Sequence, residues 1–134
     1  MAKITEVEGI GPTYGGKLAD AGIATQEKLL EEGGTKKSRK EIAGNTGISE
    51  KLILEWVNQA DLARIKGVGS EYADLLEATG VDTVPELAQR NAANLHKKME
   101  EVNARKKLVR AIPSEGQVED WVSQAKSLPR AVHY

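Results

Sequence analysis

The chain has 134 residues, of which 29% are charged, a formal net charge of −1, and neither cysteine nor phenylalanine. The lack of cysteine excludes a disulfide framework and thiolate catalysis and fits a cytoplasmic protein. The N-terminus has no long apolar run, so neither a signal peptide nor a membrane span is predicted there. The length suits one compact domain or two small ones with aliphatic cores.

The first half of the chain predicts helices only, because no run of alternating apolar and polar residues marks a strand. A short helix near residues 3–7 leads into a glycine turn. Pro12 suits the first position of the second helix, where no amide donor is needed, and Gly22 suits its end. A third helix is expected from about Gln26.

Two further helices complete this half. Thr35 is expected to cap the first of them and Ser49 the second, since each side chain can accept a hydrogen bond from a first-turn amide. One apolar face of the last helix predicts a buried tryptophan and is formed by Leu52, Ile53, Trp56, Val57 and Ala60.

The second half predicts the same plan, with residues 61–64 running directly into its first helix. Three helix caps follow from residue type and spacing: Thr83 with Glu86, Asn91, and Ser114 with Gln117. We therefore predict a first repeat over residues 1–62, a second over 63–130, and a C-terminal tail over 131–134.

A Gly-hydrophobic-Gly turn recurs in the two halves. It reads Gly9-Ile10-Gly11 in the first and Gly67-Val68-Gly69 in the second, 58 residues later, and the match continues downstream at the same offset. The tryptophan recurs at an offset of 65, as Trp56 and Trp121, so the second repeat has gained seven residues. Repeats this small are expected to pack on each other.

A small residue stands four positions after each turn, Gly15 in the first repeat and Ala73 in the second. This spacing resembles the helix-hairpin-helix motif. The resemblance implies an all-α fold of two tandem helix-hairpin-helix domains, each a SAM-domain-like five-helix unit, packed together. It also implies that backbone amides after the turn bind a DNA phosphate without reading bases, and that turn carbonyls can hold a monovalent cation. Gly11 and Gly69 are expected to need backbone angles that β-branched residues cannot reach.

Two wider resemblances support this fold. The first repeat is similar to the N-terminal domain of RadA-type recombinases, over residues 7–12, 21–25 and 42–50. The whole chain resembles a bacterial and archaeal family of paired helix-hairpin-helix domains that has only a domain-of-unknown-function label. That likeness rests on residues 61–69, 86–90 and 121–125. It implies the fold and little about activity.

The charge alternates along the chain, with net values of −3 over residues 1–33, +3 over 34–66, −4 over 67–91 and +3 over 92–134. Each repeat therefore has an acidic first half and a basic second half. Either the basic halves form one stripe, or they are ordinary solvated helix faces.

Two functions remain open at this point. The first is a non-enzymatic, sequence-tolerant module for double-stranded DNA. Its candidate residues are Gly9, Ile10, Gly11, Lys17, Lys36, Lys37, Arg39, Lys40, Lys66, Gly67, Val68 and Gly69, and the four cations of residues 36–40 are expected to be exposed. The second is a protein-protein interaction adaptor or scaffold, with self-association among its outcomes. It is favoured by acidic residues beside the turns, namely Glu8, Glu71 and Asp74.

No catalytic residue, metal site or organic cofactor is predicted. The two histidines, His96 and His133, lie in no triad or metal-ligand spacing. The role of the basic segment around residues 97–110 stays open.

Overall fold

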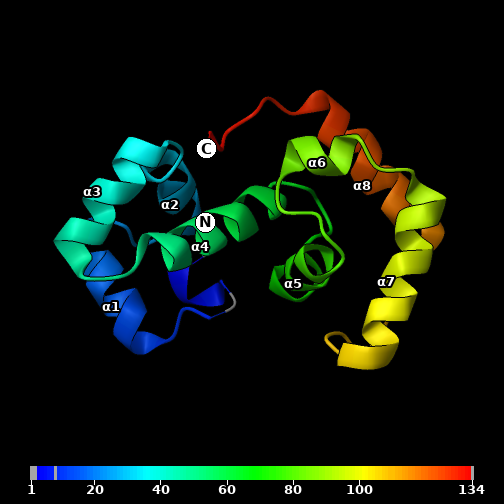
Figure 1. Ribbon diagram of the computed structural model, residues 1–134, viewed down its shortest axis with the longest axis horizontal. Helices are drawn as coiled ribbons and strands as arrows, with labels where there is room; N and C mark the ends of the chain where they lie inside the picture. Colours follow the sequence, from blue (N-terminus) through cyan, green and yellow to red (C-terminus); the bar gives the residue numbers. More distant parts are fainter. Residues whose placement is uncertain (1–2, 8, 134) are drawn as a thin grey trace. The chain divides into compact units, whose positions relative to one another are not determined.

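The computed structural model describes residues 3–7 and 9–133, and this part of the chain is helical throughout its regular elements (Figure 1). Its one β-type pairing among the described residues is an isolated bridge between Lys3 and Thr25. The all-α prediction is confirmed. Within the described residues, no helix combines the length and the apolar character needed to cross a membrane.

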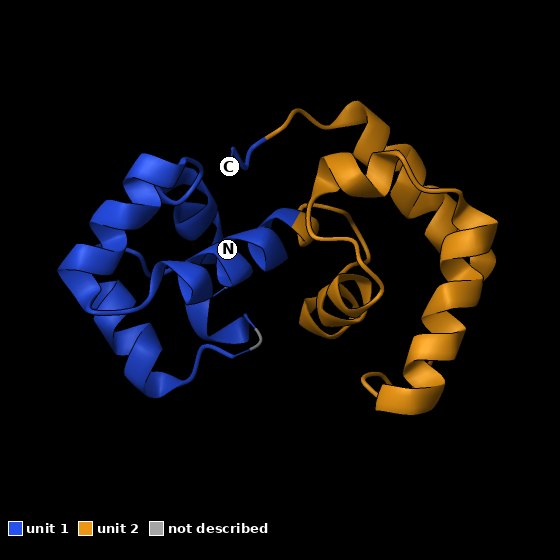
Figure 2. Ribbon diagram, in the orientation of Figure 1, with its two compact units in different colours: residues 1–61, 131–134 blue, residues 62–130 orange. Residues whose placement is uncertain are grey.

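The chain divides into two compact units, shown in Figure 2: unit 1 contains residues 1–61 and 131–134, and unit 2 contains residues 62–130. The first half of the chain forms the 3-10 helix η1 (Ile4–Glu6) and the α-helices α1 (Pro12–Asp20), α2 (Gln26–Glu32), α3 (Lys36–Thr46) and α4 (Glu50–Leu62). Unit 2 contains α5 (Ser70–Ala78), α6 (Val84–Ala88), α7 (Ala92–Lys106) and α8 (Glu115–Ser127).

Four of the eight α-helices in the described part of the chain begin at side-chain caps that the sequence predicts. Thr35 and Ser114 each form a complete capping box, and the side chain of Asn91 accepts a hydrogen bond from the amide of Asn94 at 3.0 Å. The Ser49 hydroxyl accepts one from the amide of Leu52 at 3.2 Å. Local spacing alone therefore places these four helix starts.

Thr83 is the N-cap residue of α6, as the sequence predicts, but the capping box predicted there is wrong. The Thr83 hydroxyl donates a hydrogen bond to the Glu86 carboxylate at 3.3 Å, and the second carboxylate oxygen accepts from the amide of Asp82 at 3.3 Å. The hydroxyl accepts no hydrogen bond from a first-turn amide of that helix.

Unit 2 has four helices and not the five expected of it. Residues 63–69 form turns where unit 1 has η1, so the prediction that residues 61–64 continue into a helix is also wrong. The amide of Val68 donates to the carbonyl of Ile65 at 3.1 Å, and both side chains are buried. A tight turn brings these two apolar residues to the core within four positions.

Each unit has its own apolar core with one buried tryptophan. Trp56 is 2% exposed in unit 1 and Trp121 is 1% exposed in unit 2. Each indole packs against a tyrosine of the helix that follows the glycine turn: the ring centroids of Tyr14 and Trp56 are 5.1 Å apart, and those of Tyr72 and Trp121 are 5.3 Å apart. The predicted burial and equivalence of the tryptophans are confirmed.

The segment predicted as a tail packs into unit 1. Val132 is 1% exposed within the core of that unit, and the amide of His133 donates to the carbonyl of Gly34 at 2.7 Å. Tyr134 lies outside the described residues. Unit 1 is thus assembled from two stretches of chain that flank unit 2 in the sequence.

Candidate nucleic-acid interface

The first glycine of each turn is required by the fold. Gly9 has φ +91° and Gly67 has φ +98°, a region that L side chains rarely adopt. A Cβ at Gly9 would come within 3.3 Å of the indole nitrogen of Trp56, and one at Gly67 within 3.0 Å of that of Trp121. Backbone conformation and the neighbouring tryptophan each make a larger residue strained at these positions.

The middle residue of each turn anchors the turn and does not face solvent. Ile10 is 3% exposed and Val68 is 5% exposed. Their amides donate to the carbonyls of Val7 and Ile65, both at 3.1 Å. Neither side chain nor amide is open to a ligand, so both residues position the turn, and DNA contact through their remaining backbone atoms stays a prediction.

The second glycine of each turn is not required by the fold. Gly11 has φ −89° and ψ −173°, Gly69 has φ −90° and ψ −174°, and a Cβ at either would meet no heavy atom within 4 Å. This is extended backbone that any residue adopts, so the expectation that Gly11 and Gly69 need special backbone angles is wrong. The strained glycines are their partners two positions earlier.

Gly11 and Gly69 are the N-caps of α1 and α5, and no side chain caps either helix. The first amides of a helix have no acceptor within the helix. In α1 these are the amides of Thr13 and Tyr14, because Pro12 has none. The sequence thus leaves two helix starts open, with positive ends of the helix dipoles beside them.

Two exposed lysines accompany the turns. Lys17 lies in the last turn of α1, and Lys66 directly precedes Gly67. The Gln124 side chain holds the backbone of Lys66, accepting from its amide at 2.9 Å and donating to its carbonyl at 3.1 Å. The ammonium group of Lys66 therefore starts from a fixed backbone. The residue at the matching position of the first turn, Glu8, lies outside the described residues.

Three of the four cations predicted at the start of α3 are exposed: Lys36, Lys37 and Lys40. Arg39 is 4% exposed, and its guanidinium donates to the carbonyls of Gly33 at 2.9 Å and His133 at 2.8 Å. The prediction of an exposed Arg39 is wrong, because Arg39 lies three residues before the buried Ile42 and shares its inward face.

The structure does not bring the first turn and the exposed lysines of α3 together. In Figure 1, α1 begins at the lower edge of unit 1 and α3 begins at the upper edge. The sequence predicts these groups as one phosphate-binding set, and they lie at opposite ends of the unit. A cavity of about 370 Å³ adjoins the α3 group and is lined by Lys36, Arg39, Glu50, Lys51 and Leu54.

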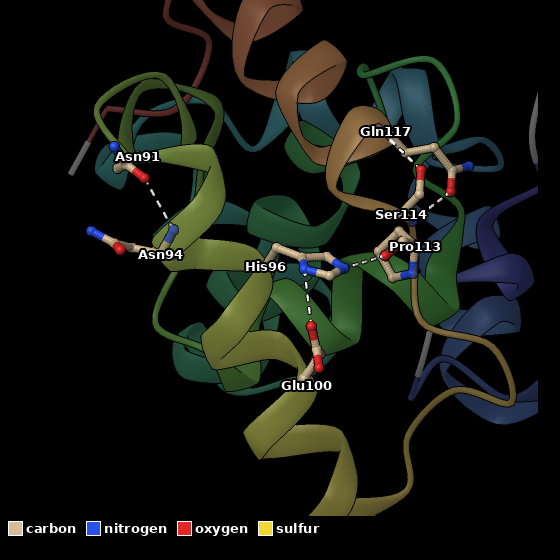
Figure 3. Close-up of polar contacts among 7 residues, drawn as sticks. All are labelled: Asn91, Asn94, His96, Glu100, Pro113, Ser114 and Gln117. Carbon is tan, nitrogen blue, oxygen red and sulfur yellow. Dashed lines mark hydrogen bonds and ion pairs between the residues drawn. The ribbon is translucent and has the colours of Figure 1, made fainter.

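His96 has a structural setting in unit 2, shown in Figure 3. Its Nδ1 lies 3.1 Å from a carboxylate oxygen of Glu100, and its Nε2 lies 2.8 Å from the carbonyl oxygen of Pro113. The ring thereby ties α7 to the residue before the Ser114 cap of α8. No group of three or more histidine, cysteine or acidic side chains gathers at metal-binding range within residues 3–7 and 9–133.

A family model described as a domain of unknown function (DUF4332) matches residues 8–128. No curated protein and no solved structure matches the chain.

Proposed function

The chain belongs to the DUF4332 family of domains of unknown function, and we propose that it is a non-enzymatic module that binds duplex DNA through two helix-hairpin-helix turns. The turns contact phosphates and read no bases, which makes the binding tolerant of sequence.

One observation carries this proposal: both turns keep a glycine where the protein itself needs none. Gly11 and Gly69 adopt ordinary backbone angles and face open space. Serine, threonine, aspartate or asparagine at an N-cap stabilises a helix by about 1 kcal/mol relative to alanine and by a few tenths of a kcal/mol relative to glycine. A bare glycine forgoes a cap of its own, and its missing side chain allows an external acceptor to reach the first-turn amides.

A DNA phosphate fits such a position. Its oxygens only accept hydrogen bonds, and its charge is favoured at the positive end of a helix dipole. Lys66 adds positive charge directly before the second turn, and Lys17 adds it in the last turn of the helix that follows the first. Turn carbonyls would also suit a monovalent cation that bridges to the same phosphate, as part of this proposal.

The alternative is a protein-protein interaction adaptor, with a second copy of the chain as one partner. It is favoured by the separation of Lys36, Lys37 and Lys40 from the first turn, and by the acidic Glu71 in the first turn of α5. The bare helix starts in both units weigh more, because an adaptor surface gives no reason to leave the two amide sets uncapped.

The test is a fluorescence anisotropy titration with a labelled duplex at about 50 and 200 mM salt, using two unrelated sequences. We expect similar affinity for both sequences and a steep loss with salt. The double variant Gly11→Thr with Gly69→Thr should fold, since threonine suits an extended N-cap, and should bind DNA much more weakly because its hydroxyl occupies the amides.

The matched control makes the same change at open glycines away from the turns, Gly44→Thr with Gly116→Thr, one in each unit. It should bind DNA as the unchanged protein does. Absence of duplex binding at about 50 mM salt would favour the adaptor, and sedimentation of the same samples would then report self-association. Equal binding by both double variants would remove the turns from the site.

A further inference from the structure

Unit 2 has a polar cavity beside its glycine turn that the sequence does not reveal. It measures about 550 Å³ and is lined by Glu71, Asn103, Lys107, Leu108, Val109 and Arg110. Most of this lining belongs to the end of α7 and the segment after it, within the part of the second repeat that contains the seven additional residues. Glu71 comes from the first turn of α5, two residues after Gly69.

The segment that lines the cavity is held in one conformation. The Asn103 side chain donates to the carbonyl of Val109 at 3.1 Å and accepts from its amide at 3.0 Å. The Tyr72 hydroxyl donates to the carbonyl of Ala111 at 3.0 Å. Lys107 ends α7 with φ +51°, in the left-handed region, and its amide donates to the carbonyl of Asn103 at 2.8 Å. The backbone of the cavity wall is therefore set before any ligand arrives.

The two cations of this wall have no partner of their own. The side chains of Lys107 and Arg110 are exposed and form no hydrogen bond or ion pair within the part of the chain that the structure describes. The neighbouring Lys106 differs, because its charge acts on Asp74: burial raises the pKa of the Asp74 carboxyl, and Lys106 opposes that rise. Lys107 and Arg110 are thus left for an external anion.

We propose that this cavity is a second phosphate subsite, in which Lys107 and Arg110 hold a backbone phosphate of the DNA strand whose neighbouring phosphate lies at Gly69. The subsite rests on the proposed function. Since Glu71 lies within one helical turn of the Gly69 cap, the cavity adjoins the turn at which the strand is proposed to bind. The additional residues of the second repeat thereby supply positive charge beside a turn that α5 itself surrounds with acidic residues.

Glu71 makes the subsite testable by charge sign. Its carboxylate faces the same cavity as the two cations and repels an anion there. Glu71→Gln should therefore tighten duplex binding several-fold. If the cavity instead held a basic group of a protein partner, Glu71→Gln would weaken the binding of that partner.

The experiment compares Lys107→Gln with Arg110→Gln against a control pair, Lys97→Gln with Lys98→Gln, which removes equal charge from α7 at positions away from the cavity. A labelled duplex of about 20 base pairs, two helical turns, is titrated over a salt series. The cavity pair should weaken binding several-fold and flatten the salt slope by about one unit, because one phosphate fewer is neutralised. The control pair should leave the slope nearly unchanged, and circular dichroism should show both folded.

Each of the other outcomes overturns the subsite alone or the subsite together with the proposed function. If the unchanged protein binds duplex and the cavity pair matches the control, the subsite is wrong and the proposed function stands. If Glu71→Gln weakens duplex binding, the cavity does not hold phosphate. If the unchanged protein binds no duplex, both proposals fail together.

Discussion

The Arg39 guanidinium donates a 2.8 Å hydrogen bond to the backbone carbonyl of His133, 94 residues further along the chain. It also donates to the carbonyl of Gly33 at 2.9 Å. One buried side chain thus joins the start of α3, the loop after α2 and the C-terminal segment. A buried charge is tolerated only with such partners, so Arg39 is part of the framework of unit 1 and not of its surface.

We therefore expect Arg39→Ala to destabilise the protein by about 2–4 kcal/mol, because two carbonyls would no longer have a charged donor. Arg39→Lys should restore little, since one ammonium does not reproduce the guanidinium fork. Lys40→Ala is the control, expected within about 0.5 kcal/mol. Urea unfolding measures all three. Equal midpoints for Arg39→Ala and Lys40→Ala would contradict the assignment.

The two glycines of the second turn should differ in how strongly their replacement by alanine destabilises the protein. Gly67→Ala combines a positive φ with a Cβ 3.0 Å from the Trp121 indole, and we expect a destabilisation of about 1–3 kcal/mol. Gly69→Ala meets neither problem and should cost less, about 0.5–1 kcal/mol, because alanine is a poorer N-cap than glycine. Thermal unfolding followed by tryptophan fluorescence measures both. A larger destabilisation at Gly69 would refute the division of roles within the turn.

The effect of replacing lysines of unit 1 on DNA binding should depend on the length of the duplex. Lys17→Gln should weaken binding to a duplex of about 10 base pairs, one helical turn, because Lys17 lies on the helix of the turn. Replacing Lys36, Lys37 and Lys40 by glutamine should leave that short duplex unaffected, since the α3 group lies at the other end of the unit. Any contribution from the group should appear only with longer DNA. If both sets of substitutions weakened binding to the short duplex equally, Lys17 and the α3 lysines would belong to one site.

Asp82 should make stability depend on pH. Burial, together with the Glu86 carboxylate, raises the pKa of Asp82 above its ordinary value of 3.8. A raised pKa means that ionisation of Asp82 is less favourable in the folded state than in the unfolded state. The stabilising contribution of Asp82 to the free energy of unfolding is therefore fully present below its ordinary pKa, and it disappears as pH rises through the raised pKa.

Asp82→Asn should therefore be more stable than the unchanged protein at neutral pH, with the difference shrinking as the solution is made acidic. Denaturant unfolding across this range tests the shape of the curve, with the exposed Glu101→Gln on α7 as the control. A difference that grows on acidification has the wrong sign for this explanation.

The sequence predicts what depends on neighbours along the chain. The caps at Thr35, Ser49, Asn91 and Ser114 follow from spacing within one helical turn, and the burial of Trp56 follows from helical periodicity. These features need no knowledge of distant segments, because the groups that form them lie within a few residues of one another.

Other features depend on groups that only folding brings together. Arg39 lies inward because carbonyls from two distant segments accept its hydrogen bonds, and a run of four cations gives no sign of them. Gly67 and Gly69 are identical in sequence, and only φ separates the glycine that the fold needs from the one it does not. The cavity at Lys107 depends on the side-chain hydrogen bonds between Asn103 and Val109.

The division of unit 1 across the chain sets the order in which the protein can fold during synthesis. Translation makes Val132 only after all of unit 2, yet Val132 is a buried member of the unit 1 core. Domains generally fold from the N-terminus as they emerge from the ribosome. Here the first unit to emerge is the last to be complete, and a nascent chain stalled before residue 131 presents an unfilled apolar site on unit 1 although unit 2 has already been made.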